Sequence, residues 1–244
     1  MKTAEMLKSL QLLHPLQNLD AITQQATQKA WSLRDYLDHL LEGECQRRQT
    51  HAIARRIKQA RFPVRKELVD FNWNWPTKIN RAQVQDLFRL EFVPACANVI
   101  FVGGVGLGKT HLATALGQRA CEAGHSVLFT TAVGMVNTLS AAHASQRLRQ
   151  ELRRYKRPAL LIIDELGYLP IDKLGADLLF QVFSERYERG AIVLTTNKTY
   201  KHWPSIFNND ATLASAVLDR LLHHADTVLI EGKSWRMKNS LPDA

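Results

Sequence analysis

A glycine-rich stretch between an apolar run and a helix-forming segment constrains the fold of this sequence most. The apolar run covers residues 99–102, and the helix-forming segment begins at His111. The stretch itself reads Gly103-Gly104-Val105-Gly106-Leu107-Gly108-Lys109-Thr110. Glycines let backbone N–H groups curve around phosphate oxygens, and the N-terminus of the following helix adds partial positive charge. Strand, glycine-rich turn and helix form the context that a P-loop requires, so the sequence predicts a bound nucleoside triphosphate.

Two side chains at the end of this stretch carry the expected phosphate chemistry. We expect Lys109 to place its charge against the β- and γ-phosphates and Thr110 to ligate Mg²⁺. A glycine-rich turn without a ligand is the alternative, and the Lys-Thr pair in this context argues against it. The residues expected to contact the nucleotide are Gly103, Gly104, Val105, Gly106, Leu107, Gly108, Lys109, Thr110 and His111.

An acidic pair after a second apolar run indicates hydrolysis of the triphosphate. Residues 160–163 are followed by Asp164 and Glu165. We expect their strand to lie beside the P-loop strand, where Asp164 can hold Mg²⁺ through water. Glu165, on the other side of the pleat, would orient and deprotonate the attacking water. An ordinary acidic pair at a strand end is the alternative, and the preceding P-loop argues against it. The pair also favours an ATPase over a kinase, because a P-loop kinase would need no water-activating glutamate here.

Further polar residues follow the later elements. Asn197 comes after the run 192–195 and could hydrogen-bond the γ-phosphate and the lytic water, although Asn is also a common turn residue. Arg220 is either a surface cation or a group that reaches the phosphates of a neighbouring subunit. The adjacent pair His223-His224 resembles a metal site only superficially, because adjacent helical residues point in different directions.

Apolar runs alternate with amphipathic segments through the second part of the chain. Strands are expected at 99–102, 126–130, 159–163, 191–195 and 227–230, and helices at 109–122, within 132–156, at 173–188 and at 211–223. Near-continuous apolar strands with crossover helices indicate an α/β fold, a P-loop parallel sheet with helices on both faces. We expect a small helical domain over 1–66, a linker over 67–80 and the ATPase domain over 81–244.

The N-terminal region has helical periodicity and a run of basic residues. Pro15 is expected to interrupt the first helical segment, and Ser32 with Asp35 predicts the start of a second helix. Phe71, Trp73 and Trp75 in the linker are expected to anchor it on the next domain, with base stacking as the alternative. Phosphate contact, rather than a merely solvated face, is expected for the cations of this region. For the cations of the segment 147–157, contact with a DNA backbone and a solvated face are equally open on pattern alone. The candidate cations are Arg47, Arg48, Arg55, Arg56, Lys58 and Arg61 in the first of these segments, and Arg149, Arg153 and Arg154 in the second.

Composition narrows the partners and the compartment. The chain of 244 residues has a formal net charge of +9, which favours a polyanion such as nucleic acid. Its three cysteines are far apart and indicate reduced thiols without a zinc site. The N-terminal residues lack the apolar core of a signal peptide, and no apolar run is long enough to span a membrane. A cytoplasmic protein without membrane contact is expected.

Several longer runs make the resemblance to a known family specific. They are Ala60-Arg61-Phe62-Pro63, Glu165-Leu166-Gly167-Tyr168-Leu169-Pro170 and Leu218-Asp219-Arg220-Leu221-Leu222-His223-His224. With them, the sequence resembles the IstB-type transposition helper ATPases encoded by insertion sequences. These are AAA+ proteins close to the DnaC-like helicase loaders.

The resemblance implies roles for individual residues and for the whole chain. It implies that Asn197 is the sensor-one residue, Arg220 an arginine finger that acts in trans, and Arg236 the sensor-two arginine. It also implies a homo-oligomer, a ring or spiral, that assembles with ATP on double-stranded DNA and deforms it. The assembly would recruit and stimulate a cognate transposase. A replicative helicase loader of the DnaC type is the alternative.

Overall fold

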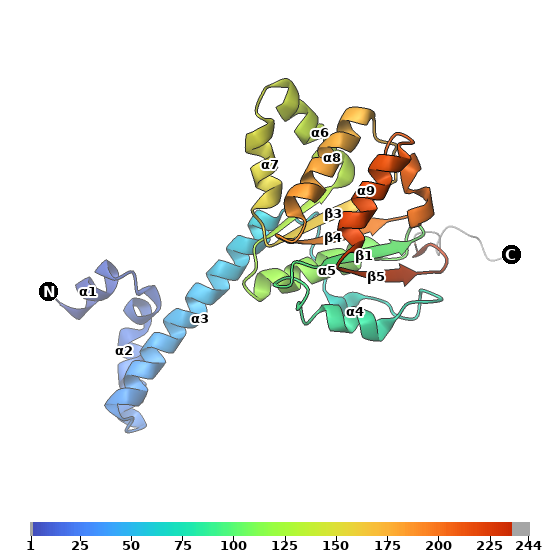
Figure 1. Cartoon of the computed structure of the whole chain (residues 1–244). Coiled ribbons are helices and arrows are strands. Elements are labelled where there is room, and N and C mark those ends of the chain that lie inside the picture. Colours follow the sequence, from blue (N-terminus) through green and yellow to red (C-terminus); the bar gives the residue numbers. More distant parts are fainter. Residues whose placement is uncertain (1, 236–244) are drawn as a thin grey trace. The chain divides into compact units, whose positions relative to one another are not determined.

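The computed structural model describes residues 2–235, in which a group of N-terminal helices is followed by an α/β fold (Figure 1). The chain divides into two compact units, residues 1–55 and residues 56–244. The division falls inside helix α3 (Leu33–Ala60), whose last turn packs into the core of the second unit through Ala60. The domain boundary expected at residue 66 stays a prediction, since α3 crosses the division without a break.

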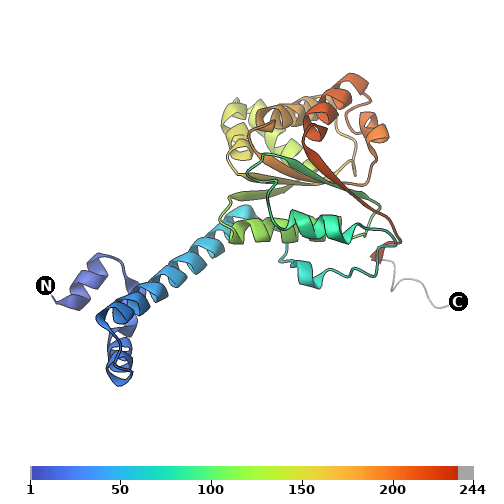
Figure 2. The same cartoon turned by 60° about the horizontal axis from the view of Figure 1, so that its bottom comes forward.

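The second unit is built on a five-stranded parallel sheet with helices on both faces (Figure 2). The strand order is β2-β3-β4-β1-β5, and each neighbouring pair is parallel. The strands are β1 (Asn98–Gly103), β2 (Val127–Thr131), β3 (Leu160–Leu166), β4 (Ala191–Thr196) and β5 (Ala225–Ile230). The expected P-loop fold class is confirmed, but the expected strand neighbour is wrong. The strand that carries Asp164 is separated from the P-loop strand by β4.

Alternate residues of strands β1 to β4 enter two separate cores. Ile100 and Val102 pack with α6 (Ala132–Ala144), α8 (Lys173–Arg186) and α9 (Ala211–Leu222). Val99 and Phe101 pack with α4 (Arg81–Leu87) and α5 (Lys109–Glu122). Burial on both faces explains why the strands read as continuous apolar runs rather than alternating ones. The remaining elements are α7 (Leu148–Lys156) and the 3-10 helices η1 (Leu68–Asp70) and η2 (Tyr200–Ser205).

A buried arginine fixes the end of α8 to the sheet. Arg186 is 1% exposed, and its guanidinium donates to five backbone carbonyls. The shortest bonds reach the carbonyl oxygens of Ala191 at 2.7 Å and Tyr155 at 2.8 Å. Burial lowers the pKa of Arg186 to about 10. This side chain satisfies carbonyls that end α7 and begin β3 and β4, which would otherwise lack partners in the interior.

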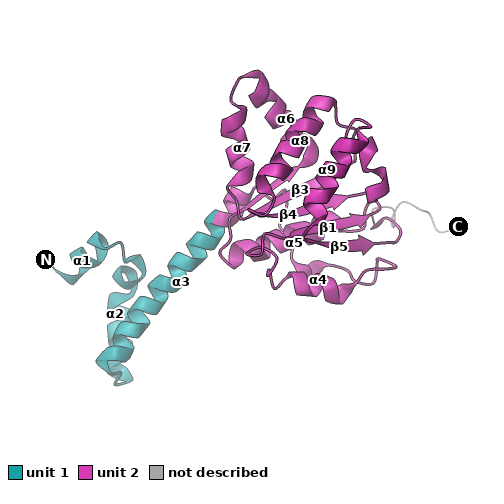
Figure 3. Ribbon diagram, in the orientation of Figure 1, with its two compact units in different colours: residues 1–55 teal, residues 56–244 magenta. Residues whose placement is uncertain are grey.

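The first unit, coloured separately in Figure 3, contains α1 (Thr3–Ser9), α2 (Leu13–Gln28) and most of α3. The capping box expected at Ser32 is confirmed, because the Asp35 amide donates to the Ser32 hydroxyl and the Ser32 amide donates to the Asp35 carboxylate, each at 3.2 Å. The interruption expected at Pro15 is wrong. Pro15 lies in the first turn of α2, where its missing N–H has no helical acceptor to lose.

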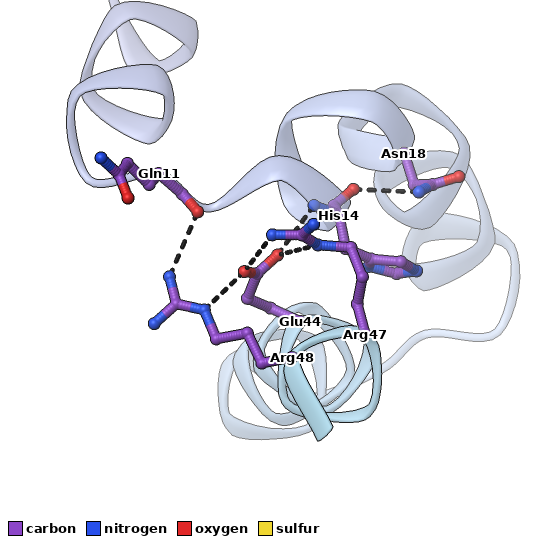
Figure 4. A network of polar contacts seen from close by, with 6 residues as sticks. All are labelled: Gln11, His14, Asn18, Glu44, Arg47 and Arg48. Carbon is purple, nitrogen blue, oxygen red and sulfur yellow. Dashed lines mark hydrogen bonds and ion pairs between the residues drawn. The ribbon is translucent and has the colours of Figure 1, made fainter. Parts of the chain in front are cut away.

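A buried carboxylate joins α2 to α3 within this unit (Figure 4). Glu44, which is 2% exposed, accepts hydrogen bonds from Arg47 at 2.9 Å, from Arg48 at 2.7 Å and from the His14 amide at 2.9 Å. The hydrogen bonds from Arg47 and from the His14 amide lower the pKa of Glu44 to about 2. Arg48 also donates to the Gln11 carbonyl oxygen at 3.1 Å. Glu44, through the His14 amide, and Arg48, through the Gln11 carbonyl, therefore connect α3 to the chain around the start of α2, while Arg47 holds the Glu44 carboxylate.

Within residues 2–235, no helix is both long and apolar enough to cross a membrane.

Candidate nucleotide-binding site

The glycine-rich stretch connects β1 to α5 at the carboxyl end of the sheet. Gly106 and Gly108 have left-handed backbones, with φ of 74° and 85°, and Gly108 is the N-cap of α5. A Cβ atom on Gly108 would lie 2.6 Å from Cε2 of Phe71. Glycine is therefore required at this position by both its backbone conformation and the space around it. The first amide groups of a 14-residue helix consequently face the loop, as phosphate binding requires.

The lysine of the stretch is buried and held against the loop. Lys109 is 4% exposed, and its Nζ donates to the Gly104 carbonyl oxygen at 2.6 Å. The Tyr168 hydroxyl lies 3.4 Å from the same Nζ, and the centre of the Tyr168 ring lies 5.9 Å away. The cation is thus positioned beside the backbone amides that precede α5, where the phosphates of a nucleotide are expected.

Two strands, β3 and β4, and helix α5 contribute to one hydrogen-bond network at the edge of the sheet. The Thr110 hydroxyl lies 3.0 Å from both oxygens of the Asp164 carboxylate. The Thr195 hydroxyl donates to Oδ1 of Asp164 at 2.5 Å and accepts from the Glu165 amide at 2.9 Å. The β4 strand between β1 and β3 thereby supplies the hydroxyl that fixes both acidic residues. Carboxylate and hydroxyl oxygens at this position match the ligands that Mg²⁺ prefers.

The backbone at Glu165 interrupts the regular strand. Its φ is 62°, and the pairing of β3 with β4 shifts register between Ile163 and Leu166. The simple alternation of faces expected for Asp164 and Glu165 does not describe this bulge. Glu165 lines the same pocket as Thr110. A non-glycine residue in this conformation requires support from its surroundings, and such residues are common at functional sites.

A pocket of about 510 Å³ lies over the glycine-rich stretch. Besides that stretch, the segment that precedes the sheet lines the pocket, and so does Trp235, which follows the last strand. Trp75 and Trp235 contact each other edge to face, with ring centres 4.7 Å apart. The lining residues are Val64, Lys66, Asp70, Phe71, Asn72, Trp75, Pro76, Gly106, Leu107, Gly108, Lys109, Thr110, His111, Thr114, Glu165, Tyr168 and Trp235.

The aromatic linker residues divide between two roles. Phe71 is 7% exposed and lies in the core with α5, and Trp73 packs against the same core. Their expected anchoring role is confirmed. Trp75, like Phe71, lines the pocket, and its indole N–H donates to the Lys233 carbonyl oxygen at 2.8 Å. Trp235 approaches from the other end of the chain and donates its backbone N–H to the Gly106 carbonyl oxygen at 3.0 Å.

The remaining expected site residues lie at different places. Asn197 follows β4, between the strands of the P-loop and of Asp164, and its buried Oδ1 has no hydrogen-bond partner within residues 2–235. Arg220 does not line the nucleotide pocket. Its guanidinium donates to the Ala216 carbonyl oxygen at 2.9 Å and lies 4.7 Å from the Phe180 ring centre. Arg236 lies outside the described residues.

Some of the basic residues expected to contact phosphate share a groove. Arg61, after the end of α3, and Arg153, Arg154 and Arg157 line a groove of about 720 Å³. Arg154 is partly neutralised by Glu151 at 2.8 Å. The groove brings together two basic segments that are far apart in the sequence. Arg157 was missing from the set of candidate site residues, although it follows the same basic helix.

The other basic residues of that set lie outside this groove. Arg149, Arg55 and Lys58 are exposed, and Arg56 is half-buried. Arg47 and Arg48 are bound to Glu44, as described above.

Comparison with known proteins identifies the family. A sequence model described as IstB-like ATP binding protein matches residues 5–242. The chain belongs to the IstB-like ATP binding protein family. It is 40% identical over 233 residues to an ATP-binding protein named for insertion sequence IS21 of Pseudomonas aeruginosa, covering 96% of this chain and 88% of that protein. It is 38% identical over 233 residues to one named for insertion sequence IS232 of Bacillus thuringiensis subsp. berliner, covering 96% and 93%.

Solved structures share the fold of this family member. The structure of the DnaC helicase loader matches it with a TM-score of 0.51 and 21% sequence identity. The match covers 65% of this chain and 98% of that chain. At this identity the likeness concerns the fold.

Some residues that complete the site have only weak signals in the sequence. Thr195 bonds to both acidic groups, and its only signal was its place before Thr196-Asn197 at a strand end. Tyr168 beside Lys109 lies within a run that carries the family resemblance. The side-by-side placement of Trp75 and Trp235 has no sequence signal, because 160 positions separate them.

Proposed function

We propose that this IstB-like protein is an ATPase that oligomerises on double-stranded DNA, selects and remodels it as a target, and recruits and stimulates its partner transposase. The observation that carries the proposal is the network of Thr110, Asp164, Thr195 and Glu165 at the P-loop pocket. Nucleotide binding alone needs the loop and its lysine. Hydrolysis also requires a second acidic residue, Glu165, that can activate the attacking water.

The residues of the pocket fit ATP with Mg²⁺. The left-handed glycines and the N-terminus of α5 would hold the phosphates, with Lys109 against the β- and γ-phosphates. Thr110 and Asp164 would hold Mg²⁺, which supplies positive charge against the phosphates when bound. Glu165 would take a proton from the attacking water. The buried, unpartnered Oδ1 of Asn197 would orient that water.

Oligomerisation is supported by the position of the expected arginine finger. Arg220 lies outside the pocket of its own chain, as is expected of an arginine that serves the nucleotide of a neighbouring subunit. An arginine at the transferred phosphate can contribute a large rate factor, of about 10³ or more. We propose that the protein forms a ring or spiral in the cytoplasm, in which Arg220 of each subunit completes the nucleotide site of the next.

DNA binding is supported by the groove between the end of α3 and α7. Four arginines with one neutralising glutamate give it a net positive charge. Such a surface favours a phosphate backbone without requiring base contacts. Arg149 and the exposed cations of α3 would extend this surface.

The test is a Glu165→Gln variant in the full chain, compared with Glu122→Gln on the exposed side of α5. Glu165→Gln keeps the shape of the side chain and removes the proton acceptor. We expect it to bind ATP normally, to lose ATP turnover at least tenfold, and to remain in an ATP-bound complex on duplex DNA. Glu122→Gln should behave as the unaltered protein. Unchanged turnover in Glu165→Gln would remove this residue from the mechanism.

A replicative helicase loader is the second candidate, because the fold likeness includes the DnaC helicase loader. A loader would prefer single-stranded DNA. Competition between labelled duplex and unlabelled single strands of equal length separates the two candidates. The transposition function predicts that duplex DNA competes better in the presence of ATP.

A further inference from the structure

A cluster of two histidines and one glutamate lies outside the nucleotide pocket, where α8 and α9 end. One ligand atom from each of Glu188, His223 and His224 lies within 4.8 Å of the others, and all three residues are exposed. We propose that these residues bind a divalent first-row transition metal ion of the zinc class. None of them has a role in the proposed ATP chemistry, so this proposal and the proposed function can fail separately.

The end of α9 brings the two histidines together. Adjacent residues of a continuous helix point about 100° apart, which argues against a shared ligand. However, α9 ends at Leu222, His223 is its C-cap, and β5 begins at Ala225. The two imidazole ring centres lie 4.2 Å apart with an angle of 37° between the planes. The two rings therefore lie side by side at the end of α9, although the backbone at His223 is still helical.

The third ligand comes from the connection after α8. Nδ1 of His223 lies 3.8 Å from Oε1 of Glu188. The Tyr187 hydroxyl lies 2.7 Å from the same Nδ1, and the Tyr187 and His223 rings stack with centres 5.8 Å apart. A hydrogen bond at one ring nitrogen orients a histidine that ligates through the other, so His223 would ligate through Nε2. The residue beside Glu188 thus orients one of the proposed ligands.

The local charge favours a cation despite the neighbouring arginines. Arg220, which shares a small cavity with Glu188 and His224, directs its guanidinium to the Ala216 carbonyl and to the Phe180 ring. The carboxylate of Glu188 therefore remains the charged group that faces the histidines.

The donor set indicates the class of metal. Neutral imidazole nitrogens with one carboxylate suit Zn²⁺, Ni²⁺ or Cu²⁺, whereas Mg²⁺ and Ca²⁺ take oxygen ligands. Zinc holds such ligands at about 2.0–2.2 Å. The three atoms must move closer together to reach this distance, which rotation of exposed side chains allows. Three protein ligands leave a fourth position for water.

A bound ion would join the end of α8 to the connection between α9 and β5. Arg220 lies in the last turn of α9, three positions before the first of the two histidines. Metal binding would consequently restrain the helix end that presents this arginine. Because an ion that binds only the folded chain stabilises it, Zn²⁺ should also raise the melting temperature.

The experiment titrates the full chain, free of any affinity tag and stripped with a chelator, with ZnCl₂ in a calorimeter. We expect one equivalent of Zn²⁺ to bind and an excess of Mg²⁺ not to displace it. His224→Ala and Glu188→Gln should each weaken binding at least tenfold, the order of effect seen when a metal site is disturbed. His202→Ala, at an exposed histidine of η2, is the matched control and should leave binding unchanged. Circular dichroism without metal checks that every variant is folded.

Cobalt provides an independent readout. Co²⁺ in place of Zn²⁺ should give visible ligand-field absorption that both cluster variants lose. Absence of saturable Zn²⁺ binding in the unaltered chain would overturn the proposal. Zn²⁺ binding that both cluster variants retain but Cys96→Ser loses would also overturn it, because the ion would then be held at a thiol.

Discussion

Thr195→Val is the substitution that most directly probes the acidic network of the nucleotide site. Valine keeps the shape of threonine but removes the hydroxyl that donates to Asp164 at 2.5 Å and accepts from the Glu165 amide at 2.9 Å. Thr195 is 0% exposed and Asp164 is 3% exposed, so water cannot replace the lost partner. A hydrogen bond to a charged group together with an unpaired buried amide is worth about 3 kcal/mol in the free energy of unfolding.

Two measurements follow from this substitution. About 3 kcal/mol corresponds to a fall in melting temperature of roughly 6–12 °C for a unit of this size. The Mg²⁺ concentration that half-saturates ATP hydrolysis should rise about 10- to 100-fold, because Asp164 loses the group that orients it. Differential scanning calorimetry and a Mg²⁺ titration of ATP turnover give the two values.

Neighbouring variants serve as controls for Thr195→Val. Thr195→Ser retains the hydroxyl and should keep the Mg²⁺ dependence of the unaltered protein. Thr196→Val removes only a hydrogen bond from the Lys198 amide at 3.1 Å and should cost about 1 kcal/mol. If Thr195→Val melts and responds to Mg²⁺ as the unaltered protein does, the hydroxyl does not organise the two acidic residues.

Three further predictions concern the other polar features. Glu44 has its pKa lowered from 4.5 to about 2 in the folded chain, so its contribution to stability is complete above about pH 4.5 and lost as the pH falls toward 2. Hydrogen-exchange protection of α2 and α3 should fall over that window, and Glu44→Gln should remove that part of the pH dependence; equal pH profiles would contradict this. Arg186→Met leaves buried carbonyls unpaired and should lower the free energy of unfolding in urea by more than about 3 kcal/mol, whereas exposed Arg189→Met should change it by less than about 0.5 kcal/mol. Arg153→Gln in the basic groove should reduce the slope of log K for duplex DNA against log salt by about 1, and Arg65→Gln outside it should not.

The fold follows closely from local sequence patterns. The apolar runs predicted the central strands because a parallel sheet covered on both faces buries nearly all of their residues. The helix beginning at Lys109 followed from the P-loop context, and the helix after Ser32 followed from its capping box. These signals act over a few residues, so the sequence alone contains them.

The arrangement of the site depends on contacts that local patterns do not contain. No local pattern in the sequence indicates that β4 lies between β1 and β3, and therefore none indicates that Thr195 reaches Asp164. The sequence gives no sign of the left-handed backbone at Glu165, because that conformation is expected at glycine and is uncommon at other residues. Glu44, the acidic partner of Arg47, lies just before the basic run, so the run itself gave no sign of this ion pair.

Binding of ATP between subunits on duplex DNA is tested most directly by mass photometry of the full-length Glu165→Gln variant. The protein is measured alone, with ATP and Mg²⁺, with duplex DNA, and with all of these together. We predict a discrete oligomer on the duplex only when ATP and DNA are both present, and its loss in an Arg220→Ala, Glu165→Gln double variant. A chain that remains monomeric with ATP, Mg²⁺ and duplex DNA all supplied would contradict the proposed function.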